Sequence, residues 1–131
     1  MDISSLSPKQ VGALGEKVVA EYVRRHGMKV VAKNVTRKTG EIDLIAREGN
    51  TLHFIEVKSI LCVQFPQEWS GDDAYDPSAN LHEAKIRRVA RTSEWYVANI
   101  EWEHDWQVDG ALVWLRKRDG KAKVRYLPQI L

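Results

Sequence analysis

The chain lacks the features that would point to a secreted or membrane protein. Its 131 residues include one cysteine, Cys62, so no disulfide can form within the chain. No segment approaches the roughly 20 apolar residues of a membrane span, and the N-terminus has no basic region followed by an apolar stretch, as a signal peptide would. We therefore expect a cytoplasmic protein without membrane contact, formed by one domain over residues 1–131.

Several familiar functional motifs are also absent. No Cys/His spacing indicates a zinc site, no glycine-rich phosphate loop indicates ATP hydrolysis, and no internal repeat is present. The net charge is only +2, which does not by itself indicate nucleic-acid binding. The distribution of the charges along the chain is more informative than their sum.

The most informative segment is a predicted hairpin with charged residues inside apolar strands. Asp43 lies in the apolar run 42–46, and Glu56 and Lys58 flank Val57 at the end of the next run. Charged residues are depleted from strands and are seldom fully buried unless they are paired or bind a metal. Their presence here calls for a structural or chemical reason.

Strand geometry predicts which of these residues meet. A two-residue turn at Gly49-Asn50 places Glu48 opposite Thr51, and every earlier residue opposite one later residue. Asp43 then faces Glu56, and Glu41 faces Lys58. Directly opposed side chains lie about 5 Å apart at their Cβ atoms, so we expect a carboxylate pair with an ammonium group nearby.

Two adjacent carboxylates repel each other unless one is protonated or a cation lies between them. A hard divalent cation such as Mg²⁺, or Mn²⁺, binds carboxylate oxygens and substrate phosphate. Lys58 could then stabilise the negative charge that develops on a reacting phosphate. The residues alone leave a second interpretation open, in which these charges form a surface ladder of salt bridges.

At this point the sequence resembles a known family. Gly40–Ala46, Phe54–Lys58, Gly15–Ala20 and the Asn34-x-x-Arg37 step resemble the YraN-like family of the PD-(D/E)xK nuclease superfamily. The resemblance implies an α/β, restriction-endonuclease-like αβββαβ core, with a mixed sheet flanked by helices. It also implies a Mg²⁺-dependent DNA endonuclease, with selectivity for DNA structure like that of Holliday-junction resolvases.

The resemblance implies a role for five residues. Asp43, Glu56 and the carbonyl group of Val57 would bind the metal. Lys58 would position or activate the attacking water. Glu16, on the first helix, would be a further ligand of the metal or the water.

The first helix is expected to begin at Ser7-Pro8, where Ser7 and Gln10 can form a capping box. It is expected to end at His26-Gly27. Its buried stripe is predicted to comprise Val11, Leu14, Val18 and Tyr22. Glu16 lies off this stripe, so it either leans into a cleft beside the sheet or is an ordinary exposed side chain.

The remaining elements follow from similar patterns. A second helix is predicted from Leu81 to about Ala98, with Asn80 as its N-cap and Glu83 as the capping-box partner. Residues 65–78 are expected to form a loop. Strands are predicted at residues 30–35, 41–47, 52–58, 107–115 and 123–127.

Two basic clusters are the candidate DNA-binding residues. They comprise Lys33, Arg37 and Lys38 after the first helix, and Lys85, Arg88 and Arg91 on the second. The expected partner is DNA, with branched and nicked forms as candidate substrates, and a homodimer is a candidate assembly. Two alternatives stay open: the clusters could be ordinary solvated faces, and the protein could be a nucleic-acid-binding or assembly module with little or no turnover.

Overall fold

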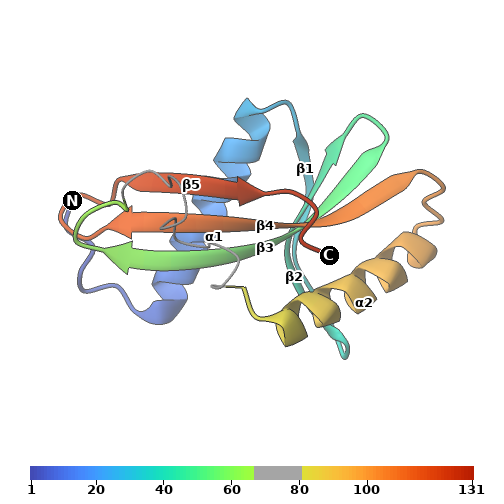
Figure 1. The fold of residues 1–131 in the computed structure, drawn as a ribbon, viewed down its shortest axis with the longest axis horizontal. Coiled ribbons are helices and arrows are strands. Elements are labelled where there is room, and N and C mark those ends of the chain that lie inside the picture. Colours follow the sequence, from blue (N-terminus) through green and yellow to red (C-terminus); the bar gives the residue numbers. More distant parts are fainter. Residues whose placement is uncertain (67–80) are drawn as a thin grey trace, which may run out of the picture.

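The computed structural model describes residues 1–66 and 81–131, which form an α/β fold with two helices and a mixed five-stranded sheet (Figure 1). The elements are α1 (Pro8–Arg25), β1 (Lys29–Arg37), β2 (Gly40–Glu48), β3 (Thr51–Cys62), α2 (Glu83–Asn99), β4 (Asp105–Arg116) and β5 (Ala122–Leu127). No helix in the described ranges is long and apolar enough to cross a membrane.

The five strands lie in the order in which they occur along the chain. β3 and β4 are parallel, and all other neighbours are antiparallel. The two helices cover opposite faces of the sheet (Figure 1), and each buries its own hydrophobic cluster against it. The strands in the middle of the sheet are therefore buried on both faces, and a polar side chain there needs a partner or an opening to solvent.

The start of α1 confirms the sequence prediction. The side chain of Ser7 accepts a hydrogen bond from the main chain of Gln10, the reciprocal bond is present, and Pro8 occupies the first turn. The predicted buried stripe, however, is rotated. The buried positions are Val11, Gly15, Val19, Ala20 and Val23, whereas Leu14, Val18 and Tyr22 are only partly buried.

Gly15 explains this rotation. A Cβ atom at position 15 would lie 1.7 Å from Oγ and 2.9 Å from Cβ of Ser59 on β3. The helix backbone can approach the sheet this closely only because residue 15 has no side chain. The face that carries Gly15 is therefore the contact face, and Glu16 lies directly beside it.

The predicted hairpin register is confirmed where the strands pair. Glu48 faces Thr51, and the ladder continues in step to Leu44 opposite Ile55. β3 is longer than expected, since it extends to Cys62. The reason is its parallel pairing with β4, which continues to Cys62 opposite Arg116 and could not be read from the local pattern.

The predicted start of the second helix was wrong. α2 begins at Glu83, its N-cap is His82 rather than Asn80, and His82 makes no side-chain cap. Glu83 does not complete a capping box, because its carboxylate instead binds Arg87 one turn later. Asn80 itself and residues 67–78 of the predicted loop lie outside the described residues.

Candidate functional site

The candidate site lies where β2 separates from β3. The ladder between these strands ends at Leu44 and Ile55. One step further along, the main-chain N–H of Val57 donates a hydrogen bond of 2.8 Å to Oδ2 of Asp43. The carboxylate of Asp43 thus replaces a main-chain carbonyl as acceptor, and its side chain is held at the point where the strands diverge.

Glu56 is the most deeply buried acid of the site, with 3% of the residue exposed. Its Oε1 lies 2.6 Å from Nζ of Lys85, whereas its buried Oε2 has no hydrogen-bond partner within the described chain. Burial and the nearby charge of Asp43 raise the pKa of Glu56 to about 7. The two carboxyl groups predicted to meet therefore do interact, and no group of the described chain occupies the second oxygen of Glu56.

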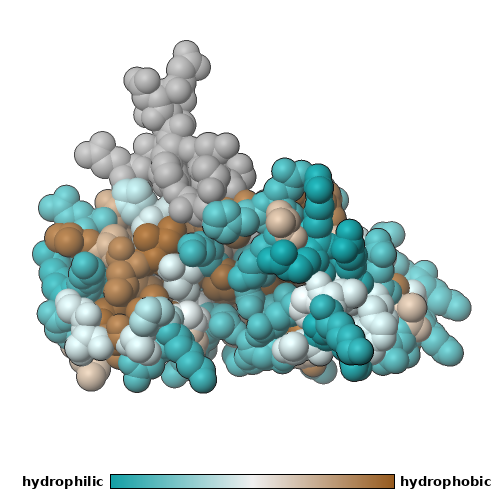
Figure 2. All heavy atoms as spheres, turned by 90° about the horizontal axis from the view of Figure 1, so that it is seen from below, coloured by the Kyte–Doolittle hydropathy of each residue, from teal (hydrophilic) through white to brown (hydrophobic). Residues whose placement is uncertain are grey.

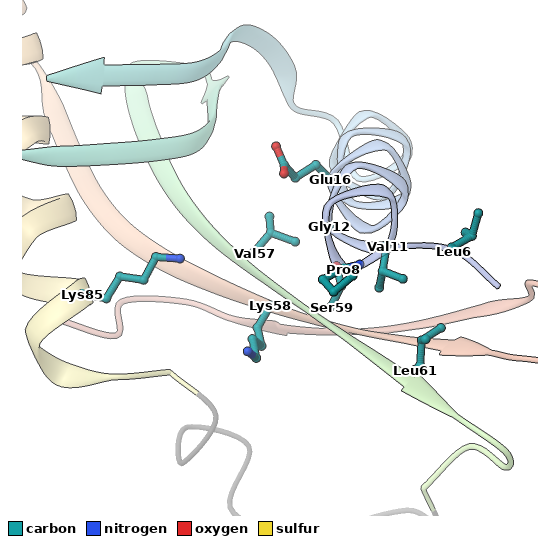
Figure 3. Close-up of a pocket in the computed structure, with 10 residues that line it drawn as sticks. All are labelled: Leu6, Pro8, Val11, Gly12, Glu16, Val57, Lys58, Ser59, Leu61 and Lys85. Carbon is teal, nitrogen blue, oxygen red and sulfur yellow. The ribbon is translucent and has the colours of Figure 1, made fainter. Parts of the chain in front are cut away.

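Glu16 reaches this site from α1. It lines a cavity of about 440 Å³ together with Val57, Lys58 and Lys85. Figure 3 shows Glu16 and Lys85 extending into this region from the two helices. Burial and the charges of Asp43 and Glu41 raise the pKa of Glu16. Glu16 is therefore half-buried beside the carboxylate pair and is not an ordinary exposed helix residue.

Lys58 occupies a different position from the other predicted residues. It lines the same cavity, but its side chain is exposed and points away from Glu16 in Figure 3. The predicted pairing of Lys58 with Glu41 is wrong. β2 has already left β3 at this point, and Glu41 instead pairs with Thr36 of β1.

Lys85 makes a contact that the sequence did not predict. The sequence predicts that Lys85 contacts DNA, and in the structure its ammonium group binds the buried carboxylate of Glu56. Burial lowers the pKa of Lys85, but the hydrogen bond and charge of Glu56 outweigh this effect and raise it. No sequence signal identified this contact, because it joins a helix and a strand separated by the undescribed residues 67–80.

The donor set suits a hard divalent cation. Asp43 and Glu56 supply carboxylate oxygens, one of which is buried with no partner among the described residues. Oxygen ligands are those that Mg²⁺ and Mn²⁺ prefer. In residues 1–66 and 81–131, no group of three or more His, Cys, Asp or Glu side chains is already arranged around a metal position. Glu16 therefore lies beside the pair but does not complete a three-carboxylate cage.

Arg37 and Lys38 of the first basic cluster lie close to the cluster on α2, because the turn between β1 and β2 docks on that helix. The hydroxyl groups of Thr39 and Thr92 lie 2.7 Å apart, and a Cβ atom at Gly40 would lie 2.9 Å from Cβ of Arg88. The guanidinium group of Arg37 stacks 3.6 Å from the ring centroid of Trp95 on α2. The part of the surface over α2 is mostly hydrophilic (Figure 2).

We define the basic surface as the exposed residues Arg37, Lys38, Arg88 and Arg91. Arg88 lies one turn beyond Lys85 on α2, so this surface begins next to the carboxylate site. Lys33 lies apart from it and lines a second cavity of about 770 Å³ with Glu16 and Glu41.

Comparison with known proteins identifies a family and several similar proteins. A profile of the uncharacterised protein family UPF0102 matches residues 15–118. A UPF0102 protein of Syntrophotalea carbinolica is 32% identical over 90% of this chain and 88% of its own length. One from Symbiobacterium thermophilum is 36% identical over 70% of each chain. The structure of a protein of unknown function from Silicibacter pomeroyi covers 97% of this chain and 77% of its own, with 19% identity and a TM-score of 0.35.

Proposed function

The chain belongs to the uncharacterised protein family UPF0102, and we propose that it is a Mg²⁺- or Mn²⁺-dependent endonuclease that hydrolyses phosphodiester bonds in DNA. In this proposal the sheet and its two helices form a restriction-endonuclease-like core of the PD-(D/E)xK type. Branched and nicked DNA are the candidate substrates.

One observation carries the proposal: two carboxyl groups meet at the point where β2 leaves β3, beside a cavity. Asp43 is fixed by the main-chain N–H of Val57, 2.8 Å away. Glu56 is buried, and one of its oxygens has no partner within residues 1–66 and 81–131. A buried unpartnered carboxylate oxygen is costly to the fold, and this cost is explained if the oxygen binds a cation during function.

Each residue of the site has a distinct role in this proposal. Asp43 and Glu56 hold the cation, with the carbonyl of Val57 as a further ligand. Bound Mg²⁺ supplies an acidified water and offsets negative charge on phosphate. Glu16 orients the water from the helix side. Lys58, which is exposed at the edge of the same cavity, stabilises the charge that develops on the phosphate oxygens.

The basic surface supplies the binding energy for DNA. Arg37, Lys38, Arg88 and Arg91 are all exposed, and guanidinium and ammonium groups contact backbone phosphates without reading sequence. No base-reading module is apparent in the described chain, so recognition of DNA shape is more consistent with this surface than recognition of a fixed sequence.

The test is a cleavage screen with Mg²⁺ or Mn²⁺ over linear, nicked, flapped and four-way DNA. We expect the wild type to cut at least one form, and Asp43→Asn and the metal-free protein to cut none. If the wild type cuts no form but binds DNA with a steep salt dependence, the chain is instead a nucleic-acid-binding module. In that case, the substitution of Arg88 would weaken binding and the substitution of Asp43 would not.

A further inference from the structure

We propose that Lys85 is a resident counter-ion of the carboxylate site, which a divalent cation must displace from Glu56 in order to bind. This inference rests on the proposed function, since it concerns the cation site of that function. In this role, a residue of α2 lowers the affinity of the two carboxylates for the metal.

The geometry of the ion pair is the first argument. Oε1 of Glu56 and Nζ of Lys85 lie 2.6 Å apart, and the side chain of Glu56 is 4% exposed whereas that of Lys85 is 48% exposed. The carboxylate is therefore fixed within β3, and the lysine reaches it from the surface along a flexible stem. Of the two partners, Lys85 can leave without unfolding any part of the sheet.

The charge balance is the second argument. Asp43 and Glu56 together carry two negative charges when ionised, and Lys85 supplies one positive charge at hydrogen-bonding distance. Glu16 and Glu41 add further negative charge around this group. One ammonium group thus leaves the site with excess negative charge, whereas a divalent cation would neutralise the pair.

The unpartnered oxygen is the third argument. Lys85 satisfies only Oε1 of Glu56, and the buried Oε2 has no partner in the described chain. A cation bound between Asp43 and Glu56 could use an oxygen that the lysine cannot satisfy. Once released, the ammonium group of Lys85 would remain at the cavity that it lines with Lys58, where it could contact a phosphate.

The test measures Mn²⁺ binding directly, through the electron paramagnetic resonance signal of free Mn²⁺, at pH 8.5 so that protons compete least for the carboxylates. Lys85→Met and Lys85→Gln both remove the competing charge, and Lys85→Arg keeps it. Arg87→Met is the matched control. It removes one positive charge from the same helix, but Arg87 pairs with exposed Glu83 and not with Glu56.

We expect Lys85→Met and Lys85→Gln to bind Mn²⁺ on the order of tenfold more tightly than the wild type. Arg87→Met and Lys85→Arg should bind no more tightly than the wild type. Equal or weaker binding by both neutral variants, with clear binding by the wild type, would overturn the role of Lys85 and leave the proposed function intact. Absence of Mn²⁺ binding in every variant would overturn both the displacement and the cation site on which the proposed function depends.

Discussion

The main-chain N–H of Val57 donates a 2.8 Å hydrogen bond to the carboxylate of Asp43. This single bond joins β2 to β3 beyond the end of their ladder at Leu44 and Ile55. It also holds Asp43 next to Glu56, whose pKa the charge of Asp43 helps to raise. Asp43 therefore stabilises the fold by accepting this hydrogen bond, and its negative charge destabilises the fold by repelling the carboxylate of Glu56.

Two substitutions separate these effects. Asp43→Asn keeps an acceptor oxygen for Val57 and removes the repulsion of Glu56, whereas Asp43→Ala removes both. In metal-free buffer at pH 8, we expect Asp43→Ala to be less stable than Asp43→Asn by about 1–2 kcal/mol, the usual cost of an unsatisfied N–H group. Urea unfolding followed by tryptophan fluorescence measures the difference. Equal stability of the two variants would show that the bond to Val57 contributes nothing.

The buried carboxyl group of Glu56 makes stability depend on pH. Its pKa in the folded protein is about 7, above the ordinary value of 4.5, so the folded state binds more protons than the unfolded state between these values. Stability is therefore greatest at low pH within this window and is lost as the pH rises through about 7. Glu56→Gln removes the titrating group at position 56, whereas every other acid and histidine of the chain stays the same in both proteins.

Between pH 5 and pH 8, we therefore expect the wild type to lose on the order of 2 kcal/mol more stability than Glu56→Gln. The comparison requires denaturant unfolding of both proteins in metal-free buffer at several pH values. Glu83→Gln is a control, because Glu83 is an exposed acid whose carboxylate pairs with Arg87. Parallel pH profiles of the wild type and Glu56→Gln would contradict the raised pKa.

Lys58 should affect the rate of cleavage and not the affinity of the protein for metal or DNA. It is exposed at the edge of the cavity, and a cationic side chain is not a ligand for Mg²⁺. We expect Lys58→Ala to lower the cleavage rate by about 10²- to 10³-fold, with metal and DNA affinities nearly unchanged. Lys121→Ala, on the exposed turn between β4 and β5, is the control. Wild-type activity in Lys58→Ala would rule out its role in the transition state.

The close approach of α1 to β3 at Gly15 gives a prediction on packing. Gly15→Ala places a methyl group 1.7 Å from Oγ and 2.9 Å from Cβ of Ser59, so helix and sheet must separate. We expect a loss of about 1–3 kcal/mol in unfolding free energy. Gly12→Ala is the matched control, since the added Cβ atom would meet no atom of another described element within 4 Å. It should be neutral or stabilising, because alanine favours helix.

A rescue experiment completes this test. Ser59→Gly removes the atoms that the new methyl group meets, so the double variant Gly15→Ala/Ser59→Gly should recover most of the stability that Gly15→Ala loses. If the double variant loses as much unfolding free energy as the two single variants together, the contact between residues 15 and 59 is contradicted.

The hairpin shows how much of the site could be predicted from the sequence. The alternation of side chains along a strand and the length of a turn are local features of the sequence. They correctly predicted the register from Glu48 opposite Thr51 to Leu44 opposite Ile55. Beyond that point β2 leaves β3 and stays paired with β1 as far as Gly40. Local pairing rules do not show where two strands separate, and the expected pair of Glu41 and Lys58 did not form.

Contacts between distant elements were the part that could not be predicted. Lys85 and Glu56 lie on a helix and a strand whose relative position is set by the packing of α2 on the sheet. The same holds for a buried polar network in which Asp109 accepts hydrogen bonds from His53 and Tyr126. His53 and Asp109 stand out as polar residues inside apolar strands, but only the parallel pairing of β3 with β4 shows that they meet.

The most direct test of the central claim, that Asp43 and Glu56 form a divalent-cation site, is thermal melting of the wild type and Asp43→Asn in EDTA and in Mg²⁺ or Mn²⁺. We predict that the metal stabilises the wild type by about 3 kcal/mol at a hundredfold excess over its dissociation constant. Asp43→Asn should show little of this gain. Superimposable melting curves of the wild type with and without metal, or an equal gain in Asp43→Asn, would contradict the cation site.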